Sequence, residues 1–337
     1  MPLIDPSTGT NPDQYSALLT TTLQNFRSQI VDNFSDATPC LWWLSQNERK
    51  RHLRGGTNIE VPLMYSGASV QAFSGYDKLV TEPTEGIAPA TFLWKKYQVP
   101  VVISRDHETD NMGESQIVSL VEAKVKQAEI SFTEEINYDL INNGYTGKAA
   151  IDTSAAHVDN MRVVGLTDVC QDTPSARQYG GISGSTYAWW KNQFFDQSDV
   201  GVANITDLLR KGYLNAARGN DAPDLILCSQ GFYENYDASL VTNKRFVNTM
   251  AADNGFESLM YRGSTMLYDR DVPDSGSGMA FMLNSNYISL YVHPDVDMQP
   301  TPFREAENQW ARYSRILWKG ALVCSNRARQ CIVDNNA

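Results

Sequence analysis

The chain has 337 residues, of which 42% are apolar and 20% charged, so it can bury a large core and is not globally disordered. Its 28 Lys and Arg against 39 Asp and Glu give a net charge of −11, which excludes a dedicated nucleic-acid binder because such proteins need a basic surface. No basic segment followed by an apolar run opens the sequence, and no apolar stretch is long enough for a membrane span. We expect an acidic protein made inside the cell.

The five cysteines are scattered and form neither a CxxC pair nor a Cys/His cluster with zinc spacing. We expect buried, reduced thiols and no structural metal. These residues are Cys40, Cys170, Cys228, Cys324 and Cys331.

The first part of the chain reads as an arm. Residues 1–11 have the composition of a flexible segment, and the apolar spacing predicts an amphipathic helix over residues 13–34. The stretch Leu41-Trp42-Trp43-Leu44 that follows must be buried somewhere.

Residues 55–105 have the pattern of a long two-stranded ribbon. Apolar residues alternate from Ile59 to Tyr65 and again from Leu93 to Ile103, while residues 66–91 between them have few apolar anchors. No helix is available to support the ribbon, and an isolated hairpin is marginally stable in water. It is therefore either disordered or rests on another chain.

The clearest helix is predicted from Gly113 to Asn143, with one apolar stripe and a length of roughly 45 Å. Three carboxylates stand just before it, at Asp106, Glu108 and Asp110. They favour a role at the positive end of the helix dipole over metal binding.

The remainder predicts a compact α+β subdomain followed by strands. Residues 146–200 are rich in loops, and a helix over 205–218, a strand over 225–228 and a helix over 232–240 come next. Strands are then predicted at 265–268, 279–283, 287–292, 313–323 and 331–333.

Candidate catalytic and metal-binding motifs are weak. The segment Gly181–Ser185 begins like a nucleophile elbow around Ser183 but lacks the closing glycine. The loop Asp269–Asp274 resembles a calcium loop, yet Pro273 occupies a ligand position, so a polar turn is favoured. The four histidines are isolated in the sequence. We expect no catalytic, cofactor or metal site, and a hydrolase using Ser183 or the Asp269–Asp274 loop is the alternative.

Two further features admit a binding role. The basic run Arg49–Arg54 could contact nucleic acid or neutralise an acidic surface on a neighbouring chain, and the charge of −11 favours contact with protein. Trp189 and Trp190 could stack on a sugar, as in a carbohydrate-binding structural module, although buried anchors are the more common use of such a pair.

The order of these elements, together with two segments, resembles the major capsid (coat) proteins of tailed bacteriophages. The segment Tyr179–Trp190 is similar to a Gly-Gly-Ile-x-x-Ser-Thr-x-x-Trp-Trp stretch of one branch of these coat proteins, and Trp318–Arg327 is similar to their C-termini. The resemblance implies an α+β fold of the Hong Kong 97 type. The expected parts are an N-terminal arm (1–54), an extended loop formed by a β-hairpin (55–105), a spine helix of the peripheral domain (106–145), a mainly axial domain (146–262) and returning strands of both domains (263–337).

The same resemblance implies a structural protein without cofactors that self-assembles into hexamers and pentamers of an icosahedral head. The expected partners are further copies of the chain, a separate scaffolding protein, a portal protein and an optional decoration protein. Such a shell encloses DNA without reading its sequence, has no contact with membranes and is assembled in the bacterial host cytoplasm before it forms part of the virion.

The extended loop of this family lies across the adjacent subunit. Intersubunit contacts are accordingly expected at Arg51, Arg54, Tyr76, Lys78 and Trp94. The founding member joins its subunits through a Lys–Asn isopeptide bond, but no catalytic Glu of this chain aligns with that site. Cross-linking between Lys78 and the terminal Asn335 or Asn336 is therefore not implied.

Overall fold

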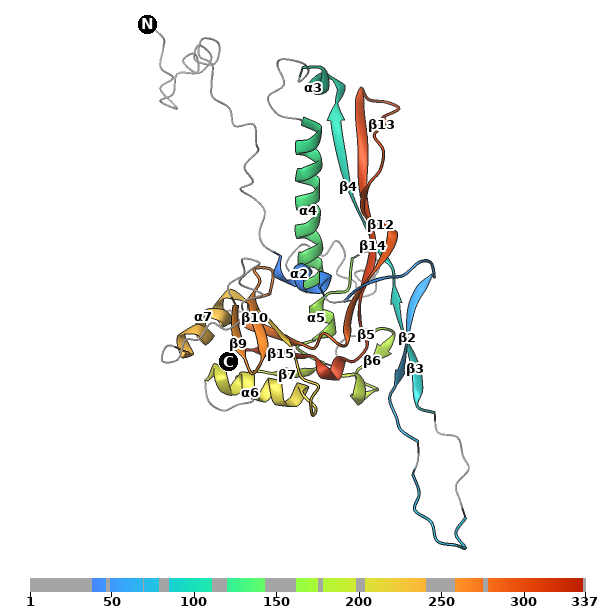
Figure 1. Ribbon diagram of the computed structural model, residues 1–337, viewed down its shortest axis with the longest axis vertical. Helices are drawn as coiled ribbons and strands as arrows, with labels where there is room; N and C mark the ends of the chain where they lie inside the picture. Colours follow the sequence, from blue (N-terminus) through green and yellow to red (C-terminus); the bar gives the residue numbers. More distant parts are fainter. Residues whose placement is uncertain are drawn as a thin grey trace.

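The computed structural model describes residues 38–46, 49–68, 70–78, 85–110, 120–142, 162–174, 178–197, 204–240, 258–274 and 278–335. The predicted arm (1–11), the helix over 13–34 and the first turns of the predicted spine helix (113–119) lie outside these residues. Figure 1 shows an elongated molecule with a helix and a tall sheet at one end, a compact α/β layer in the middle and a ribbon at the other end.

A five-stranded sheet forms the tall part of the molecule (Figure 1). Its central strand β14 pairs antiparallel with β4 on one side and with β12 and β13 on the other, and β1 adds to β12 in parallel. The strands are β1 (Lys50–His52), β4 (Lys95–Ser104), β12 (Ile288–Pro300), β13 (Arg304–Glu305) and β14 (Ala311–Cys324).

A six-stranded mixed sheet with the order β7-β15-β11-β8-β10-β9 forms the compact layer. Its strands are β7 (Gln193–Phe195), β8 (Leu225–Cys228), β9 (Ser258–Tyr261), β10 (Ser264–Tyr268), β11 (Met279–Leu283) and β15 (Cys331–Asp334). The predicted strands at 265–268, 279–283 and 331–333 belong to this sheet, whereas those at 287–292 and 313–323 belong to the five-stranded sheet. Every one of these predicted strands is confirmed.

The six-stranded sheet is buried on both faces, as its central strand shows. Ile226 and Cys228 of β8 face a core with helices α6 (Ile205–Ala216) and α7 (Gln230–Ser239), while Leu225 and Leu227 face the main core. Alternate side chains of a strand point to opposite faces, so a continuous apolar run marks a strand covered on both sides. The predicted helix–strand–helix order is confirmed.

The spine helix is α4 (Leu120–Asn142), whose 23 residues extend over roughly 35 Å. Phe132, Ile136 and Leu140 of the predicted stripe are buried, while Val121 nearer the other end is exposed. Tyr97 of β4 donates a hydrogen bond to Asp139 Oδ2 (2.6 Å), which fastens the helix to the tall sheet. No helix among the described residues is both long and apolar enough to cross a bilayer.

The carboxylates expected at the start of the spine helix lie in a separate short helix, α3 (Arg105–Asp110). Glu108 forms ion pairs with Arg105 (3.3 Å) and with Arg312 of β14 (3.2 Å). The prediction that Glu108 serves the dipole of the long helix was therefore wrong, because Glu108 pairs with Arg105 inside α3 and Arg312 binds it to the tip of the tall sheet.

The ribbon is built from β2 (Asn58–Met64) and β3 (Ile87–Leu93), which pair antiparallel. The predicted return strand was wrong beyond Leu93, since Lys95 to Ser104 leave the ribbon as β4 and pair with β14 over ten residue pairs. The ladder with β14 is longer than the seven-pair ladder of the ribbon, and β4 also packs against α4 through Tyr97 and Phe132.

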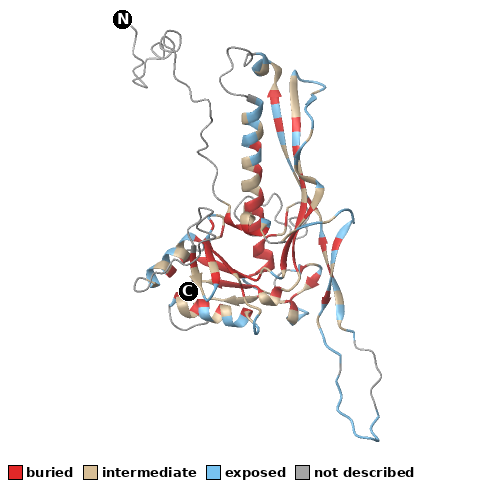
Figure 2. Cartoon of the chain, viewed as in Figure 1, coloured by how far each residue is buried: buried red, intermediate tan, exposed pale blue. Residues whose placement is uncertain are grey.

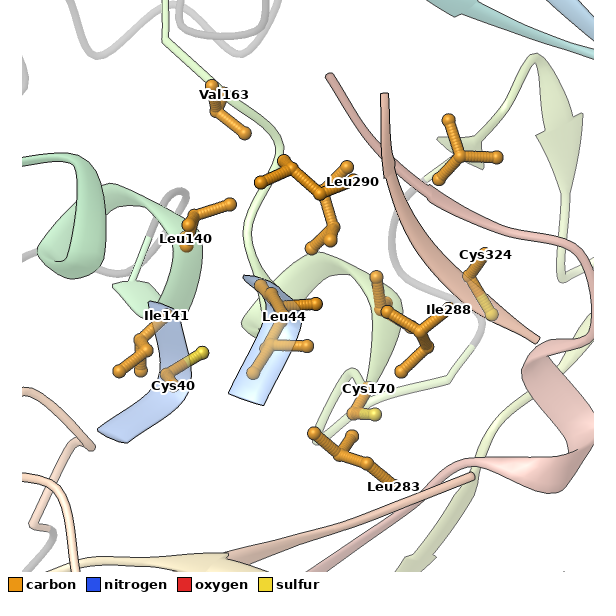
Figure 3. Packing of buried hydrophobic residues seen from close by; sticks show 14 of the residues in the cluster. Cys40, Leu44, Leu140, Ile141, Val163, Cys170, Leu283, Ile288, Leu290 and Cys324 are labelled. Atoms are coloured by element: carbon orange, nitrogen blue, oxygen red, sulfur yellow. The ribbon is translucent and has the colours of Figure 1, made fainter. Parts of the chain in front are cut away.

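A short helix, α2 (Pro39–Ser45), buries the predicted anchor. Its Leu44 lies among Leu140 of α4 and the strand residues Ile288 and Leu290, as Figure 3 shows. Trp43 is buried as well, so the segment forms a wedge between the spine helix and both sheets.

The loop-rich segment between α4 and α6 is organised by the fully buried guanidinium of Arg327, in the 3₁₀ turn η4 (Arg327–Arg329). It donates to the carbonyl oxygens of Val169 (2.9 Å), Asp168 (3.1 Å) and Trp190 (3.3 Å) and to Asn192 Oδ1 (3.2 Å). One cation thereby holds α5 (Leu166–Val169) and the turn η3 (Ala188–Trp190) against the end of the chain.

Arg327→Lys should lower the free energy of unfolding by about 2–4 kcal/mol, because lysine cannot span the four acceptors and leaves buried carbonyl groups without donors. Chemical denaturation followed by fluorescence measures this change. Arg54→Lys, at an exposed arginine, is the matched control and should stay within about 0.5 kcal/mol of the wild type. Equal stability of the two variants would contradict the role given to Arg327.

Candidate intersubunit surface

The root of the ribbon is held by the hairpin β5 (Gln178–Tyr179) and β6 (Ile182–Ser183). Thr91 of β3 donates its backbone N–H to the carbonyl of Gly180 (2.9 Å), and the ring of Phe92 meets Tyr179 edge to face at 5.2 Å. Gly180 has a φ of +60°, and a Cβ there would lie 3.0 Å from Phe92 Cζ. Only glycine fits this close approach without strain.

The two tryptophans of the coat-like segment complete this root. Trp190 is buried and donates its Nε1–H to the carbonyl of Tyr179 (2.9 Å), so it presents no free face to a sugar. Trp189 is half-buried and stacks on Tyr65 of the ribbon, with ring centroids 5.2 Å apart. The buried-anchor interpretation of the pair is confirmed for Trp190, and Trp189 is used to hold the ribbon.

The ribbon thus has a supported side and an open side. Ile59, Leu63 and Phe92 face the core and are buried, which corrects the expectation that the ribbon lacks support from its own chain. The opposite side, the outer ribbon face, carries Met64 at 79% and Ile87 at 68% exposure. Figure 2 shows burial limited to the root, with exposed residues along the rest of the ribbon. The other members of the outer ribbon face are Glu60, Pro62, Pro89 and Leu93.

The far end of the ribbon exposes large apolar side chains. Val70, Phe73 and Tyr76 are each exposed by 65% or more of their surface. Single exposed apolar residues are common, but a series of them on one projecting element marks an interaction surface.

Four of the five expected contact residues are exposed, at two places on the molecule, and the fifth packs within its own chain. Tyr76 and Lys78 lie exposed at the far end of the ribbon. Arg51 is exposed on the edge strand β1, and Arg54 is exposed and 3.6 Å from Asp295. Trp94 instead packs within its own chain, where its ring meets His293 edge to face and lies 4.9 Å from Lys319 Nζ.

The basic run is largely neutralised by its own chain. Arg49 pairs with Asp224 (3.2 Å) and stacks over Trp43, while Lys50 pairs with Asp297 (2.5 Å). These two residues are therefore paired within their own chain and not with the acidic surface of a neighbouring chain that the sequence favoured.

The candidate catalytic groups are used structurally. Ser183 Oγ hydrogen-bonds to Ser185 Oγ (2.8 Å), and a second hydroxyl is a poor general base. In the part of the chain that the structure describes, no group of three or more His, Cys, Asp and Glu could hold a metal ion. His157 lies outside the described residues.

The loop Asp269–Asp274 contains a buried junction instead of a metal site. Asp269 Oδ2 accepts the backbone N–H of Cys40 (3.2 Å), and Asn137 Oδ1 accepts that of Leu41 (3.2 Å). Asn137 also donates to Asp271 Oδ2 (2.7 Å). The Asp269 carboxylate and the Asn137 amide thus accept the free backbone N–H groups in the first turn of α2, whose N-cap residue makes no side-chain bond. The same contacts join α2 and α4 to the end of β10.

Burial is the main influence on this carboxylate and raises the pKa of Asp269 to about 6. The neighbouring Asp271 raises it further, while the donors from Asp271, Cys40 and Asn137 act in the opposite direction. The thiols are also affected: burial raises the pKa of Cys40 and Cys331, which keeps them neutral near pH 7. All five cysteines are buried and free, as expected.

The sequence pattern missed Asn137, Asp269 and Arg327 as organising residues. An isolated polar residue within an apolar stripe, as Asn137 is in α4, is a usable signal, because buried amides need partners. The glycine pair at 180–181 was noticed only as part of a resembling segment.

Comparison with known proteins identifies the fold. No family model and no curated protein matches the sequence. The capsid of cyanophage A-1(L) superposes with a TM-score of 0.63 at 15% identity, covering 93% of this chain and 96% of the other. A native GTA particle capsid gives 0.61 at 11% identity, covering 92% and 94%. The encapsulin shell of Synechococcus elongatus gives 0.53 at 9% identity, covering 95% and 94%.

In these matches the alignment covers more than nine tenths of this chain and more than nine tenths of the matched chain. The α+β fold that the resemblance implied, the Hong Kong 97 type capsid fold, is therefore confirmed. The ribbon, α4 and the two sheets described above are parts of this fold.

Gly180→Ala should lower the free energy of unfolding by about 2–3 kcal/mol, because it adds a steric clash with Phe92 and Ala90 to the strain of a positive φ. Gly181→Ala is the control, since Gly181 also has a positive φ but no neighbour within 4 Å of a Cβ. It should cost about 1 kcal/mol. Hydrogen exchange at the Thr91 amide should accelerate more in Gly180→Ala; equal effects would exclude close packing at the root.

The Asp269 junction should make stability depend on pH. Its folded pKa of about 6 lies above the ordinary 3.8, so the folded state binds the proton more tightly. This stabilisation is complete below the unfolded pKa and is lost as the pH rises to about 6 and beyond. The contribution of Asp269 to the free energy of unfolding falls by on the order of 3 kcal/mol over this pH range.

Thermal unfolding of the wild type and Asp269→Asn between pH 4.5 and 7.5 measures this contribution. The stability of the wild type relative to the variant should fall as the pH rises, because asparagine does not titrate. Asp295→Asn, at an exposed carboxylate, should follow the wild-type profile. Parallel profiles for the wild type and Asp269→Asn would refute the assignment.

Proposed function

We propose that this chain is the major capsid protein of a tailed double-stranded DNA bacteriophage and that it acts as a structural protein, not as an enzyme. The observation that carries the proposal is the ribbon, whose root is fixed in its own chain while its far side exposes a series of apolar residues. The likeness to capsid structures over more than nine tenths of the chain supports it.

Assembly would bury what a single subunit leaves open. Obligate assemblies bury thousands of Å² per chain and use apolar, well-packed contacts. In this proposal the ribbon lies across the adjacent subunit within hexamers and pentamers, with Tyr76 and Lys78 in contact at its far end. Arg51 and Arg54 contact a neighbour beside the root, and Trp94 contributes the exposed part of its ring.

The content of the shell distinguishes the proposed phage capsid from other assemblies built from the same fold. The holo-SrpI encapsulin complex, which is not described as a phage capsid, has the same fold, so the fold by itself does not specify DNA as the content. The coat-like segments Tyr179–Trp190 and Trp318–Arg327 favour the phage assignment. A scaffolding protein, a portal protein and an optional decoration protein complete the proposed partners, in a virion assembled in the host cytoplasm.

Electron microscopy of the expressed chain, with its scaffolding protein where needed, tests this function. We expect closed shells of uniform diameter, and in infected cells the same shells should protect DNA from nuclease. A monodisperse monomer under all assembly conditions would refute shell formation, and shells that enclose protein instead of DNA would assign the chain to the encapsulin class.

Replacing Ser66–Glu85 by Asn-Gly should abolish shells but leave the subunit folded. Tyr65 donates its N–H to the carbonyl of Gly86 (2.9 Å), so a two-residue turn can close the shortened hairpin. We expect the free energy of unfolding to change by about 1 kcal/mol or less, because the root stays intact. Denaturation and microscopy of the same sample measure both effects.

A second variant carries a Gly/Ser segment of equal length in place of Ser66–Glu85. It shows whether assembly needs only the length of the ribbon or also its exposed side chains. It should also fail to assemble, because it lacks the exposed side chains. An unfolded shortened variant, or shells of normal yield from either variant, would contradict the role of the ribbon.

A further inference from the structure

The hairpin that joins β9 to β10 turns on an arginine in an unfavourable conformation. Tyr261 pairs with Ser264, so Arg262 and Gly263 form a two-residue turn. Both have a positive φ, of +49° and +90°. Such a turn normally takes Asn-Gly or Asp-Gly, because a long side chain is strained in the left-handed region. Strained residues that persist in a fold are concentrated at functional sites, so the presence of Arg262 calls for an explanation.

The conformation of the turn places the guanidinium of Arg262 over two tyrosine rings. Its Cζ lies 5.8 Å from the ring centroid of Tyr213 in α6 and 5.7 Å from that of Tyr261. The two rings meet edge to face at 6.0 Å, and Tyr213 Oη donates to the carbonyl of Arg262 (3.3 Å). Within the described part of the chain, Arg262 is exposed and forms no ion pair. A cation that stacks on rings keeps the N–H groups at its edge available to an acceptor.

A second arginine lies beside the same rings. Burial raises the pKa of Tyr261, while the positive charges of Arg262 and Arg210 act in the opposite direction, so both guanidinium groups lie close to that ring. The side chain of Arg210 is 57% exposed, and its ion pair with Asp207 (2.9 Å) connects neighbouring turns of α6. We call Arg210, Arg262, Tyr213 and Tyr261 the arginine–tyrosine patch.

The arginine–tyrosine patch belongs to a basic region of an acidic protein. Residues 205–218 and 258–268, which form α6 with its C-terminal end and the β9–β10 hairpin, contain four cations and one carboxylate, a net charge of +3 (4 − 1). The cations are Arg210, Lys211, Arg218 and Arg262. Because the whole chain carries −11, this local excess of the opposite sign marks a surface for an anionic partner.

The side chains of this region favour a phosphate backbone over a protein surface. Leu214 of α6 is exposed, whereas Tyr213 and Tyr261 are half-buried beneath Arg262. Protein interfaces have a desolvated apolar core, which a single exposed leucine does not supply. Contacts with a nucleic-acid backbone need no apolar centre, because arginines bind the phosphate oxygens. The planar edge of a guanidinium donates two parallel hydrogen bonds, which matches the two free oxygens of a phosphodiester.

The net charge of the chain keeps such a contact weak. The patch offers few phosphate contacts, and the charge of −11 repels DNA from the rest of the surface. Binding that rests on phosphate contacts has dissociation constants of about 10⁻⁴–10⁻⁶ M and weakens steeply as salt is added. A local contact of this strength is compatible with a protein that is not a dedicated nucleic-acid binder.

We propose that the arginine–tyrosine patch binds the phosphate backbone of DNA, with Arg262 as its central contact and Arg210 beside it. The inference rests on the proposed function for the source of that DNA, which is the content of the shell. The stacked rings hold the guanidinium of Arg262 in one place, so less conformational entropy is lost when a phosphate binds.

Arg262→Asn in the full-length chain separates binding from folding. Asparagine suits the two-residue turn with Gly263, so the midpoint of thermal unfolding should rise by about 1–3 °C. The affinity for a fluorescent DNA duplex of about 20 base pairs should nevertheless fall about fivefold, and the slope of log affinity against log salt should decrease in size by about 1. Arg304→Asn, at an exposed arginine of β13, is the matched control and should change neither the affinity nor the slope.

Equal affinity and equal salt slope in the wild type and Arg262→Asn would overturn this inference and leave the proposed function intact. Polyglutamate that displaces the duplex as effectively as unlabelled DNA would make an acidic protein the partner and would also overturn it. Electron microscopy of the same variants should show shells in normal yield, and loss of shells in Arg262→Asn would place the patch in a subunit interface instead. Absence of shells from the wild type would count against the proposed function itself.

Discussion

The buried guanidinium of Arg327 is the constraint on which the rest of the structure depends. A charge removed from water must be paired or fully hydrogen-bonded, and here three carbonyl groups and one amide supply the acceptors. Those acceptors belong to Asp168, Val169, Trp190 and Asn192, so the cation fixes α5 and η3 against the end of the chain. Tyr179, whose ring lies 5.2 Å from the guanidinium, then presents Gly180 to the ribbon.

The subunit separates what must be stable alone from what is completed by assembly. The Arg327 centre and the Asp269–Asn137 junction satisfy buried polar groups inside one chain and join helices to sheets. The outer ribbon face and the far end of the ribbon leave apolar side chains in water. A fixed root makes this exposed surface useful, because a ribbon with a defined direction loses less conformational entropy when it docks.

The charges also differ between the interior of the chain and its open surfaces. The chain carries −11 overall, which would suit the wall of the DNA container proposed for it, because such a wall should not adhere to DNA. Locally, Arg49 and Lys50 are paired within the chain, whereas Lys96, Arg315 and Lys319 share one open face and the ribbon is acidic.

Periodicity in the sequence determined the elements whose burial is local: α6, β8, α7, the strands of the C-terminal part and most of α4. The resemblance of two short segments identified the Hong Kong 97 type fold. Only the tertiary structure decided that β4 leaves the ribbon for β14, that Glu108 serves the sheet tip, and that Asn137, Asp269 and Gly180 organise the molecule. The physical reason is that strand pairing, the burial of a charge and close packing against a glycine join residues tens to hundreds of positions apart. Alternation along the chain records which side of a strand is apolar, but not which partner covers it.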